Sequence, residues 1–183
     1  MDSNCSWYEF AQAQDQQRHL GGILANKQCF LSFHYKPDSW RVQKVKNIGS
    51  IDEQTILTAN KWEEIKKERD AAVEKWIENK MKGKECLIVL IGAKTAGRRW
   101  VKYEIKKAWA KGLGVMAIYV HSLKDANGEQ SEKGSDPFVG LKFDGESMIG
   151  TIYDPPYKTS TYVYEYISDN IEEWVKSAIE ARK

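Results

Sequence analysis

Strands and helices alternate along this 183-residue sequence, which predicts an α/β domain of three layers around a central, mainly parallel sheet of five strands. Two observations support this fold class. The segments CLIVLIG (86–92) and GVMAIYVH (114–121) are apolar on both faces, as strands are when helices cover both sides of a sheet. Apolar residues recur at helical spacing in the segments 61–82, 100–111 and 165–181.

Composition and charge exclude several classes of protein. The sequence has 42% hydrophobic and 30% charged residues, enough for a folded core. Its 28 Lys and Arg against 26 Asp and Glu give a net charge of +2, too small for the basic face of a nucleic-acid-binding protein. The longest apolar run, 86–93, is far shorter than a membrane span, and the N-terminus lacks a secretory signal pattern. We therefore expect a cytoplasmic protein with neither nucleic-acid nor membrane partners.

Cysteine and tryptophan usage adds two expectations. Cys5, Cys29 and Cys86 are odd in number and have no metal-binding spacing, which favours reduced thiols and no metal site. The seven tryptophans are expected mostly to pack in the core.

The N-terminal part of the sequence predicts an extension followed by a strand and a helix. Residues 1–26 are rich in Gln and Ala and form an extension of helical or loose structure before the domain at 27–183. The sequence QCFLSFHY from Gln28 predicts the first strand. In the turn that follows, Asp38 or Ser39 is positioned to cap the first helix.

The middle of the sequence contains the candidate crevice loop. Residues 55–58 are the best candidate for a second strand, and a long helix over 61–82 follows and ends at Gly83. The third strand, 86–92, leads through the polar loop AKTAGRR into the helix at 100–111.

The C-terminal part begins with the fourth strand, 114–121, followed by a surface insertion at about 122–147. An edge strand is expected near 148–153, and a last helix at about 165–181. Five strands in such a domain most often take the flavodoxin-like order 2-1-3-4-5. The loops after strands one and three would then flank a ligand-binding crevice.

Trp100 and Glu104 are four residues apart and share one face of the predicted helix. The core side of this helix is centred on Val101, Ile105 and Ala108, so we expect Glu104 at the rim of the crevice. An aromatic plate beside a carboxylate suits a flat heteroaromatic ring.

The residues around this pair have both functional and structural interpretations. Arg98 and Arg99 at the helix start could hold phosphate oxygens, or lie in a solvated turn. Glu104 could instead pair with Lys107 or Lys111, and Trp100 could belong to the core. Motifs of nucleotide loops, zinc proteases and serine hydrolases are absent from the sequence.

Two motifs in this order resemble a known family. FLSFHY (30–35) resembles the first strand of TIR domains, and LIVLIG followed by Trp100-Val101-x-x-Glu104-Ile105 resembles the third strand and helix of their NAD-cleaving members. More closely, SFHYKPDSWR with VLIGAKTAGRRWVKYEI is similar to TIR-like proteins of bacterial Thoeris antiphage defence, over roughly residues 27–125.

The resemblance implies an NAD+ glycohydrolase or ADP-ribosyl cyclase-like enzyme. Such an enzyme cleaves the nicotinamide–ribose bond of its substrate NAD+ and produces a cyclic or conjugated ADP-ribose signal that activates a separate effector protein. It implies no permanently bound cofactor, and it is compatible with assembly into a homo-oligomer or filament. The alternative is a non-catalytic TIR-like or flavodoxin-like module that binds a nucleotide or a protein.

By resemblance, Glu104 is the catalytic carboxylate, which stabilises an oxocarbenium-like transition state, and Trp100 packs beside it. The positions of strand one that shape the nicotinamide end of the pocket are Ser32, Phe33, His34 and Tyr35. We add Thr95, Arg98 and Arg99 to the substrate-binding residues because of their place in the crevice loop.

The sequence departs from TIR domains in three places. It lacks the Arg-Asp-x-x-Pro-Gly box of receptor TIR domains, so receptor-like adhesion is not expected, and Gly92-Ala93 replaces the usual Ser-Pro. The residues from Asp125 onward have no counterpart in the family. Their tyrosines either cap the domain under the last helix or form a specificity or assembly element; these are Tyr153, Tyr157, Tyr162, Tyr164 and Tyr166.

Overall fold

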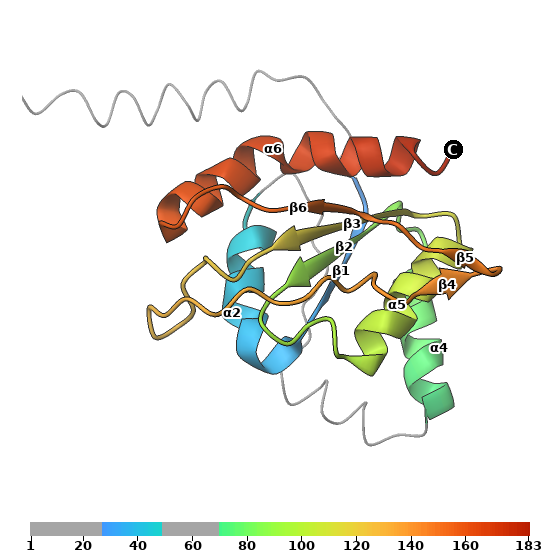
Figure 1. Ribbon diagram of the computed structural model, residues 1–183. Helices are drawn as coiled ribbons and strands as arrows, with labels where there is room; N and C mark the ends of the chain where they lie inside the picture. The colour runs from blue at the N-terminus through green and yellow to red at the C-terminus, as the bar shows by residue number, and fades with distance from the viewer. Residues whose placement is uncertain (1–26, 49–69) are drawn as a thin grey trace, which may run out of the picture.

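The computed structural model describes residues 27–48 and 70–183. The main sheet of this part of the chain is parallel and has the strand order β1-β2-β3-β6 (Figure 1). Its strands are β1 (Cys29–Phe33), β2 (Cys86–Ile91), β3 (Gly114–Tyr119) and β6 (Thr151–Tyr153). A separate antiparallel pair is formed by β4 (Lys142–Phe143) and β5 (Glu146–Ser147).

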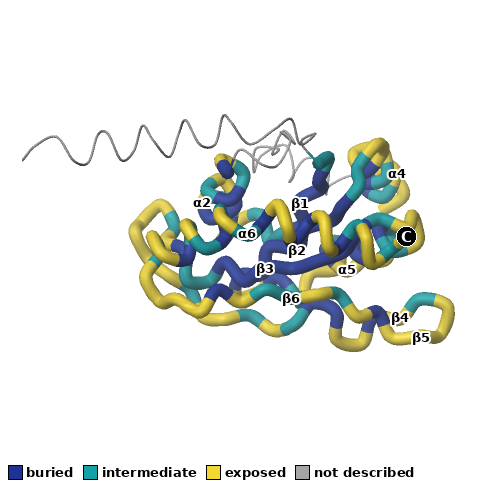
Figure 2. Tube along the Cα trace, turned by 90° about the horizontal axis from the view of Figure 1, so that it is seen from above, coloured by how far each residue is buried: buried dark blue, intermediate teal, exposed yellow. Residues whose placement is uncertain are grey.

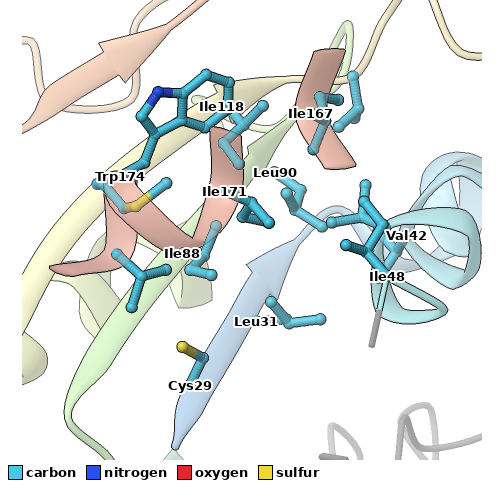
Figure 3. Packing of buried hydrophobic residues seen from close by; sticks show 14 of the residues in the cluster. Cys29, Leu31, Val42, Ile48, Ile88, Leu90, Ile118, Ile167, Ile171 and Trp174 are labelled. Atoms are coloured by element: carbon cyan, nitrogen blue, oxygen red, sulfur yellow. The ribbon is translucent and has the colours of Figure 1, made fainter. Parts of the chain in front are cut away.

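Helices cover both faces of the sheet. The described helices are α2 (Tyr35–Lys46), α4 (Asp70–Lys80), α5 (Arg99–Ala110) and α6 (Ser160–Glu180). The helices α2 and α6 pack on one face, in a core cluster that includes Leu31, Val42 and Ile167 (Figure 3). The helices α4 and α5 pack on the other face, in a cluster that includes Val89 and Ile105. This arrangement confirms the predicted three-layer α/β fold.

The two central strands are buried along their whole length. Every residue of β2 and β3 is buried, and the buried segments in Figure 2 follow these strands through the middle of the molecule. Alternate residues of each strand point to opposite faces, so Cys29 and Leu31 join the α2 and α6 side, whereas Phe30 joins the α4 and α5 side. Apolar residues on both faces are therefore required by the layer architecture.

The strand order agrees with the predicted topology as far as it is described. The first strand, β1, lies beside the predicted third strand, β2, which places their carboxyl ends together. The described sheet has four strands rather than five, and the candidate strand at 55–58 lies outside the described residues. The extension at 1–26 also lies outside them, as does the first part of the helix predicted at 61–82.

The start of α2 differs from the prediction. The helix begins at Tyr35, with His34 at its N-cap position, so Asp38 and Ser39 lie inside it rather than capping it. Asp38 is buried at 1% exposure and pairs with Arg41 one turn later. The buried carboxylate is compensated within the helix itself, because Arg41 lies three residues further along α2.

The C-terminal part is packed more closely than the sequence indicated. The predicted insertion at 122–147 is only partly a surface segment, because Phe138 and Leu141 are buried against the α5 side of the sheet. The last helix begins at Ser160, earlier than the predicted residue 165. Tyr153 stacks on Trp174 with ring centroids 4.1 Å apart, which supports the capping interpretation for this tyrosine.

Not all tryptophans are core residues. Trp40 on α2 is 53% exposed, whereas most of the tryptophans were expected to pack in the core. Trp174 is buried. Among the described helices, none combines the length and apolar character that crossing a membrane requires.

Candidate active site

The site is centred on a hydrogen bond between β1 and α5. Ser32 lies one residue before the end of β1, and its Oγ donates to Oε2 of Glu104 at 2.5 Å. The two side chains come from positions 72 residues apart and are both buried, with 1% and 7% exposure. The contact therefore exists only because α5 packs over the end of β1.

Glu104 is not at the rim, where the helical spacing placed it. The residues Val101, Ile105 and Ala108 form the buried face of α5 as predicted, but Glu104 is buried with them. A small serine on the facing strand leaves room for a carboxylate at this position. Lys107, a candidate partner of Glu104, instead forms an ion pair with Glu78 at 2.7 Å.

The environment of Glu104 favours its neutral form. Burial raises the pKa of this carboxyl group to about 8, although the hydrogen bond from Ser32 lowers it. A carboxylate that leaves water loses its hydration, and one hydrogen bond compensates only part of that loss. At neutral pH, Glu104 is therefore mostly protonated in the described structure.

Trp100 lies at the outer end of the same helix face. It is half-buried, and it makes an edge contact with the ring of Tyr103, with centroids 5.9 Å apart. The guanidinium group of Arg99 lies over the Trp100 ring, 4.7 Å from its centroid. One face of the Trp100 ring is therefore covered by the guanidinium group of Arg99.

The two arginines at the start of α5 have different surroundings. Arg99 donates two hydrogen bonds to Asp70 of α4, at 3.1 and 2.5 Å, so a carboxylate engages the guanidinium group predicted to hold phosphate. Arg98 is exposed at the N-cap position, and its Nε donates to the carbonyl oxygen of Lys94 at 3.3 Å. Neither contact joins these arginines to Glu104.

Thr95 holds the loop between β2 and α5. Its fully buried Oγ1 accepts a hydrogen bond from the backbone N–H of Gly92 at 3.0 Å and donates to the carbonyl oxygen of Leu90 at 3.4 Å. Both functions of the hydroxyl are used within the loop. These contacts give Thr95 a role in holding the loop, and its contact with the substrate stays a prediction.

The predicted residues at the end of β1 separate onto different sides. Ser32 points to the α5 side, whereas Phe33 packs against the α2 and α6 cluster and stacks on Tyr35 at 5.3 Å. His34 is half-buried at the start of α2. Strand alternation explains this separation, and of these four residues only Ser32 is in hydrogen-bond contact with Glu104.

A family model for the TIR-like domain of the Thoeris protein ThsB matches residues 30–125, which include β2, α5 and all of β1 except its first residue. The chain belongs to this family. A relative from Bacillus cereus (strain MSX-D12), named "Putative cyclic ADP-D-ribose synthase ThsB1", is 32% identical over 135 residues, which cover 70% of each protein. The family resemblance inferred from the two sequence motifs is confirmed.

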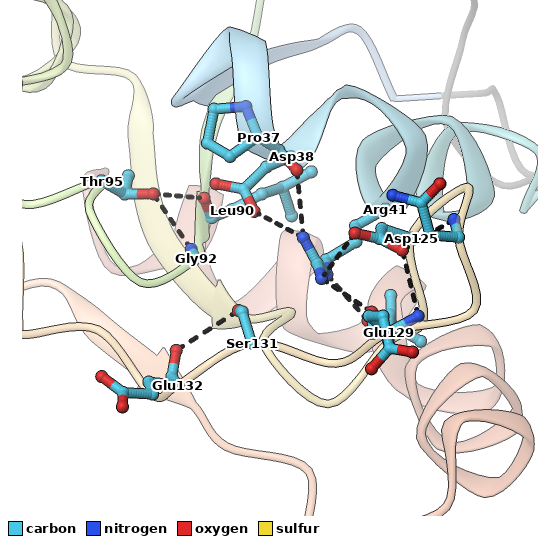
Figure 4. A network of polar contacts seen from close by, with 12 residues as sticks. Pro37, Asp38, Arg41, Leu90, Gly92, Thr95, Asp125, Glu129, Ser131 and Glu132 are labelled. Atoms are coloured by element: carbon cyan, nitrogen blue, oxygen red, sulfur yellow. Dashed lines mark hydrogen bonds and ion pairs between the residues drawn. The ribbon is translucent and has the colours of Figure 1, made fainter.

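The sequence did not indicate a buried polar network beside the site of this ThsB-family domain. Arg41 is 3% exposed, and its guanidinium group donates to the carbonyl oxygens of Leu123 at 2.8 Å and Glu129 at 2.9 Å (Figure 4). It also pairs with Asp38 at 3.2 Å. Burial raises the pKa of Asp38, and Arg41 lowers it. The network connects α2 to the segment after β3.

A glycine joins this network to the loop between β2 and α5. A Cβ atom at Gly92 would lie 2.2 Å from Oδ2 of Asp38, so only glycine fits there. The replacement of Ser-Pro by Gly92-Ala93 was the sequence signal for this close approach. Among the described residues, no group of three His, Cys, Asp or Glu side chains is placed to hold a metal ion.

Proposed function

We propose that this ThsB-family protein consumes NAD+ by cleaving the nicotinamide–ribose bond and converts the ADP-ribose unit into a cyclic or conjugated signal for an antiphage effector. The observation that supports this function best is the buried Ser32–Glu104 pair at the carboxyl ends of parallel strands. The name of the Bacillus cereus relative describes the same class of product. We expect the reaction to take place in the cytoplasm.

In the proposed reaction, Glu104 acts on developing positive charge. The nicotinamide ring of NAD+ carries a positive charge, and the C–N bond breaks with both electrons moving to the ring nitrogen. Nicotinamide leaves as a neutral molecule, and the ribose becomes an oxocarbenium-like cation. An ionised carboxylate beside that carbon stabilises the cation. The proposed role of Ser32 is to orient this carboxylate.

The substrate itself can ionise Glu104. A pKa of about 8 means that the carboxyl group is mostly protonated before NAD+ binds. A cationic ring placed beside it favours the carboxylate and lowers its pKa. Ionisation would then coincide with the correct placement of the nicotinamide.

The product of the reaction depends on which nucleophile attacks the oxocarbenium carbon. Attack by an atom of the same ADP-ribose unit gives a cyclic product, whereas water gives free ADP-ribose. With Glu104 7% exposed, access of NAD+ requires an opening or assembly step, and the same step can exclude water. The self-assembly that the family resemblance allows would fit this requirement.

The test is the substitution Glu104→Gln, which keeps the shape of the side chain and removes its charge. NAD+ loss and nucleotide products are measured by mass spectrometry, with purified protein and in extracts of phage-infected cells. We expect at least a hundredfold loss of NAD+ turnover, as for other groups that stabilise transition-state charge. Glu172→Gln on the exposed side of α6 is the matched control. Equal turnover by Glu104→Gln and the parent would show that the proposal is wrong.

Burial of Glu104 also favours a second function, that of a non-catalytic nucleotide-binding module. In such a module the protonated Glu104 would only join α5 to β1. Titration of NAD+ or ADP-ribose, followed by tryptophan fluorescence, separates the two functions. Binding without NAD+ turnover in an infected-cell extract supports the module, and turnover that depends on Glu104 supports the enzyme.

A further inference from the structure

A second polar cluster lies at the carboxyl ends of β3 and β6. Lys133 Nζ is 4.5 Å from the centroid of the Tyr119 ring and 2.5 Å from Oδ2 of Asp154. The ring of His121 meets the Tyr119 ring edge to face, with centroids 5.6 Å apart. The cluster combines a cation, an acceptor and an aromatic platform outside the site around Glu104.

This cluster is on the same side of the sheet as Glu104. Tyr119 belongs to the core cluster that contains Val101 and Ile105 of α5. In the sheet, Ser32 of β1 is level with Val89 of β2 and Ala117 of β3. Tyr119 therefore lies two strands away from Ser32 and two residues closer to the carboxyl end of the sheet. Strand spacing and rise per residue put Tyr119 about 12 Å from Ser32 across the sheet.

The segment that contains Lys133 runs along the carboxyl end of the sheet, between the cluster around Tyr119 and the site around Glu104. The backbone N–H of Ser131 donates to the carbonyl oxygen of His121 at 2.9 Å, which holds the segment against the end of β3. A Cβ atom at Gly134 would lie 2.1 Å from the carbonyl oxygen of Gly92. Gly92 directly follows β2, at the start of the loop that leads to α5. A ligand that extends from Glu104 along this edge would therefore reach Lys133.

The ammonium group of Lys133 is held in place and accessible. Its side chain is 50% exposed and that of Asp154 is 44% exposed, whereas Tyr119 is 8% exposed. Asp154 raises the pKa of Lys133, so the amine stays charged. An ion pair at this exposure contributes little to stability, so a phosphate oxygen can replace the carboxylate at small cost.

We propose that Lys133 binds the adenosine-side phosphate of the dinucleotide substrate, with Tyr119 as the surface that positions its ammonium group. This inference rests on the proposed function, which places the ribose carbon of NAD+ at Glu104. From that carbon the substrate runs through one ribose to a diphosphate, and a charged donor at the second phosphate distinguishes a dinucleotide from a mononucleotide. Lys133 is then a specificity-determining residue of the insertion.

The experiment compares Lys133→Ala with the parent, using the full chain. Binding of ADP-ribose is measured by calorimetry, and KM and kcat for NAD+ are measured in an infected-cell extract. We expect Lys133→Ala to weaken ADP-ribose binding and raise the KM for NAD+ by about tenfold, with kcat nearly unchanged. Binding of nicotinamide mononucleotide, which lacks the second phosphate, is expected to stay the same. Lys142→Ala, at an exposed lysine of β4, is the matched control.

Asp154→Asn separates this role from a structural one. If Lys133 binds phosphate, removal of the competing carboxylate leaves ADP-ribose binding unchanged or makes it tighter. If the ion pair only anchors the segment to β6, Asp154→Asn and Lys133→Ala weaken binding equally, which overturns the inference. Unchanged ADP-ribose binding in Lys133→Ala, or no binding by the parent, also overturns it. Loss of binding in Lys133→Ala without any NAD+ turnover by the parent contradicts the proposed function and supports the phosphate site.

Discussion

At the scale of single residues, the chemistry proposed for this domain depends on how Glu104 is buried. The hydrogen bond from Ser32 is the contact that favours its charged form, and burial opposes that form. A buried carboxyl group with a pKa near neutrality is typical of sites that use its charge, because the charge can be switched by a ligand. The same property makes the stability of the fold depend on pH.

Glu104 is expected to make the protein less stable as pH rises. Its pKa is about 8 when folded and near 4.5 when unfolded, so the folded state keeps a proton that the unfolded state releases. The stability contribution is therefore complete below pH 4.5 and is lost as pH rises through about 8. When the pH rises from 5.5 to 7.5, the free energy of unfolding of the parent should fall by about 2 kcal/mol more than that of Glu104→Gln.

Urea unfolding at the two pH values measures this difference, because all other titrating groups are shared by the two proteins. Glu172→Gln serves again as the control and should follow the parent. Parallel loss of stability in the parent and Glu104→Gln would mean that Glu104 does not titrate in this range.

At the scale of elements, the loop between β2 and α5 positions the start of α5. Thr95 closes the loop on itself through Gly92 and Leu90, and Gly92 fits against Asp38 of α2. The loop has little freedom, so the direction in which α5 leaves the sheet is determined by these contacts.

Thr95→Val is expected to lower the free energy of unfolding by about 1 to 2 kcal/mol. Valine has nearly the same shape, but it leaves the buried N–H of Gly92 without its acceptor. Thr95→Ser keeps the hydroxyl group, so its free energy of unfolding should fall less than that of Thr95→Val. Urea unfolding of the two variants at one pH compares them, and equal stability would show that the hydrogen bond does not hold the loop.

At the scale of the whole molecule, Arg41 connects parts of the chain that are far apart in sequence. It joins α2 to the carbonyl oxygens of Leu123 and Glu129, 82 and 88 residues further along. Through this contact the segment after β3 is attached to the same end of the sheet that contains Ser32 and Glu104. The position of this segment therefore depends on a buried arginine of α2.

Arg41→Ala is expected to destabilise the fold by about 3 to 5 kcal/mol, because it leaves the buried Asp38 without its partner. Amide hydrogen exchange should become faster in residues 122–130, where Arg41 binds. Arg41→Lys keeps the charge and should recover part of the loss, while Arg98→Ala at the exposed start of α5 should change stability little. Unchanged exchange in 122–130 would argue against the anchoring role.

Much of the fold followed from the sequence because its signals are local. The doubly apolar segments became β2 and β3, the apolar spacing of α5 predicted its buried face, and two motifs indicated the family. The candidate strand at 55–58 remains a prediction, since it lies outside the described residues. The sequence predicted which residues belong to the candidate site, but it did not predict which of them contact one another.

The sequence by itself determined the layer architecture and the presence of one acid on the helix after β2, since hydrophobic periodicity and motif spacing are properties of neighbouring residues. Only the tertiary structure decided that Glu104 is buried against Ser32 and that Lys133 lies over the Tyr119 ring at the end of β3. The physical reason is that burial and pKa depend on partners 72 or more residues away, and that an irregular loop has no period from which its position can be predicted.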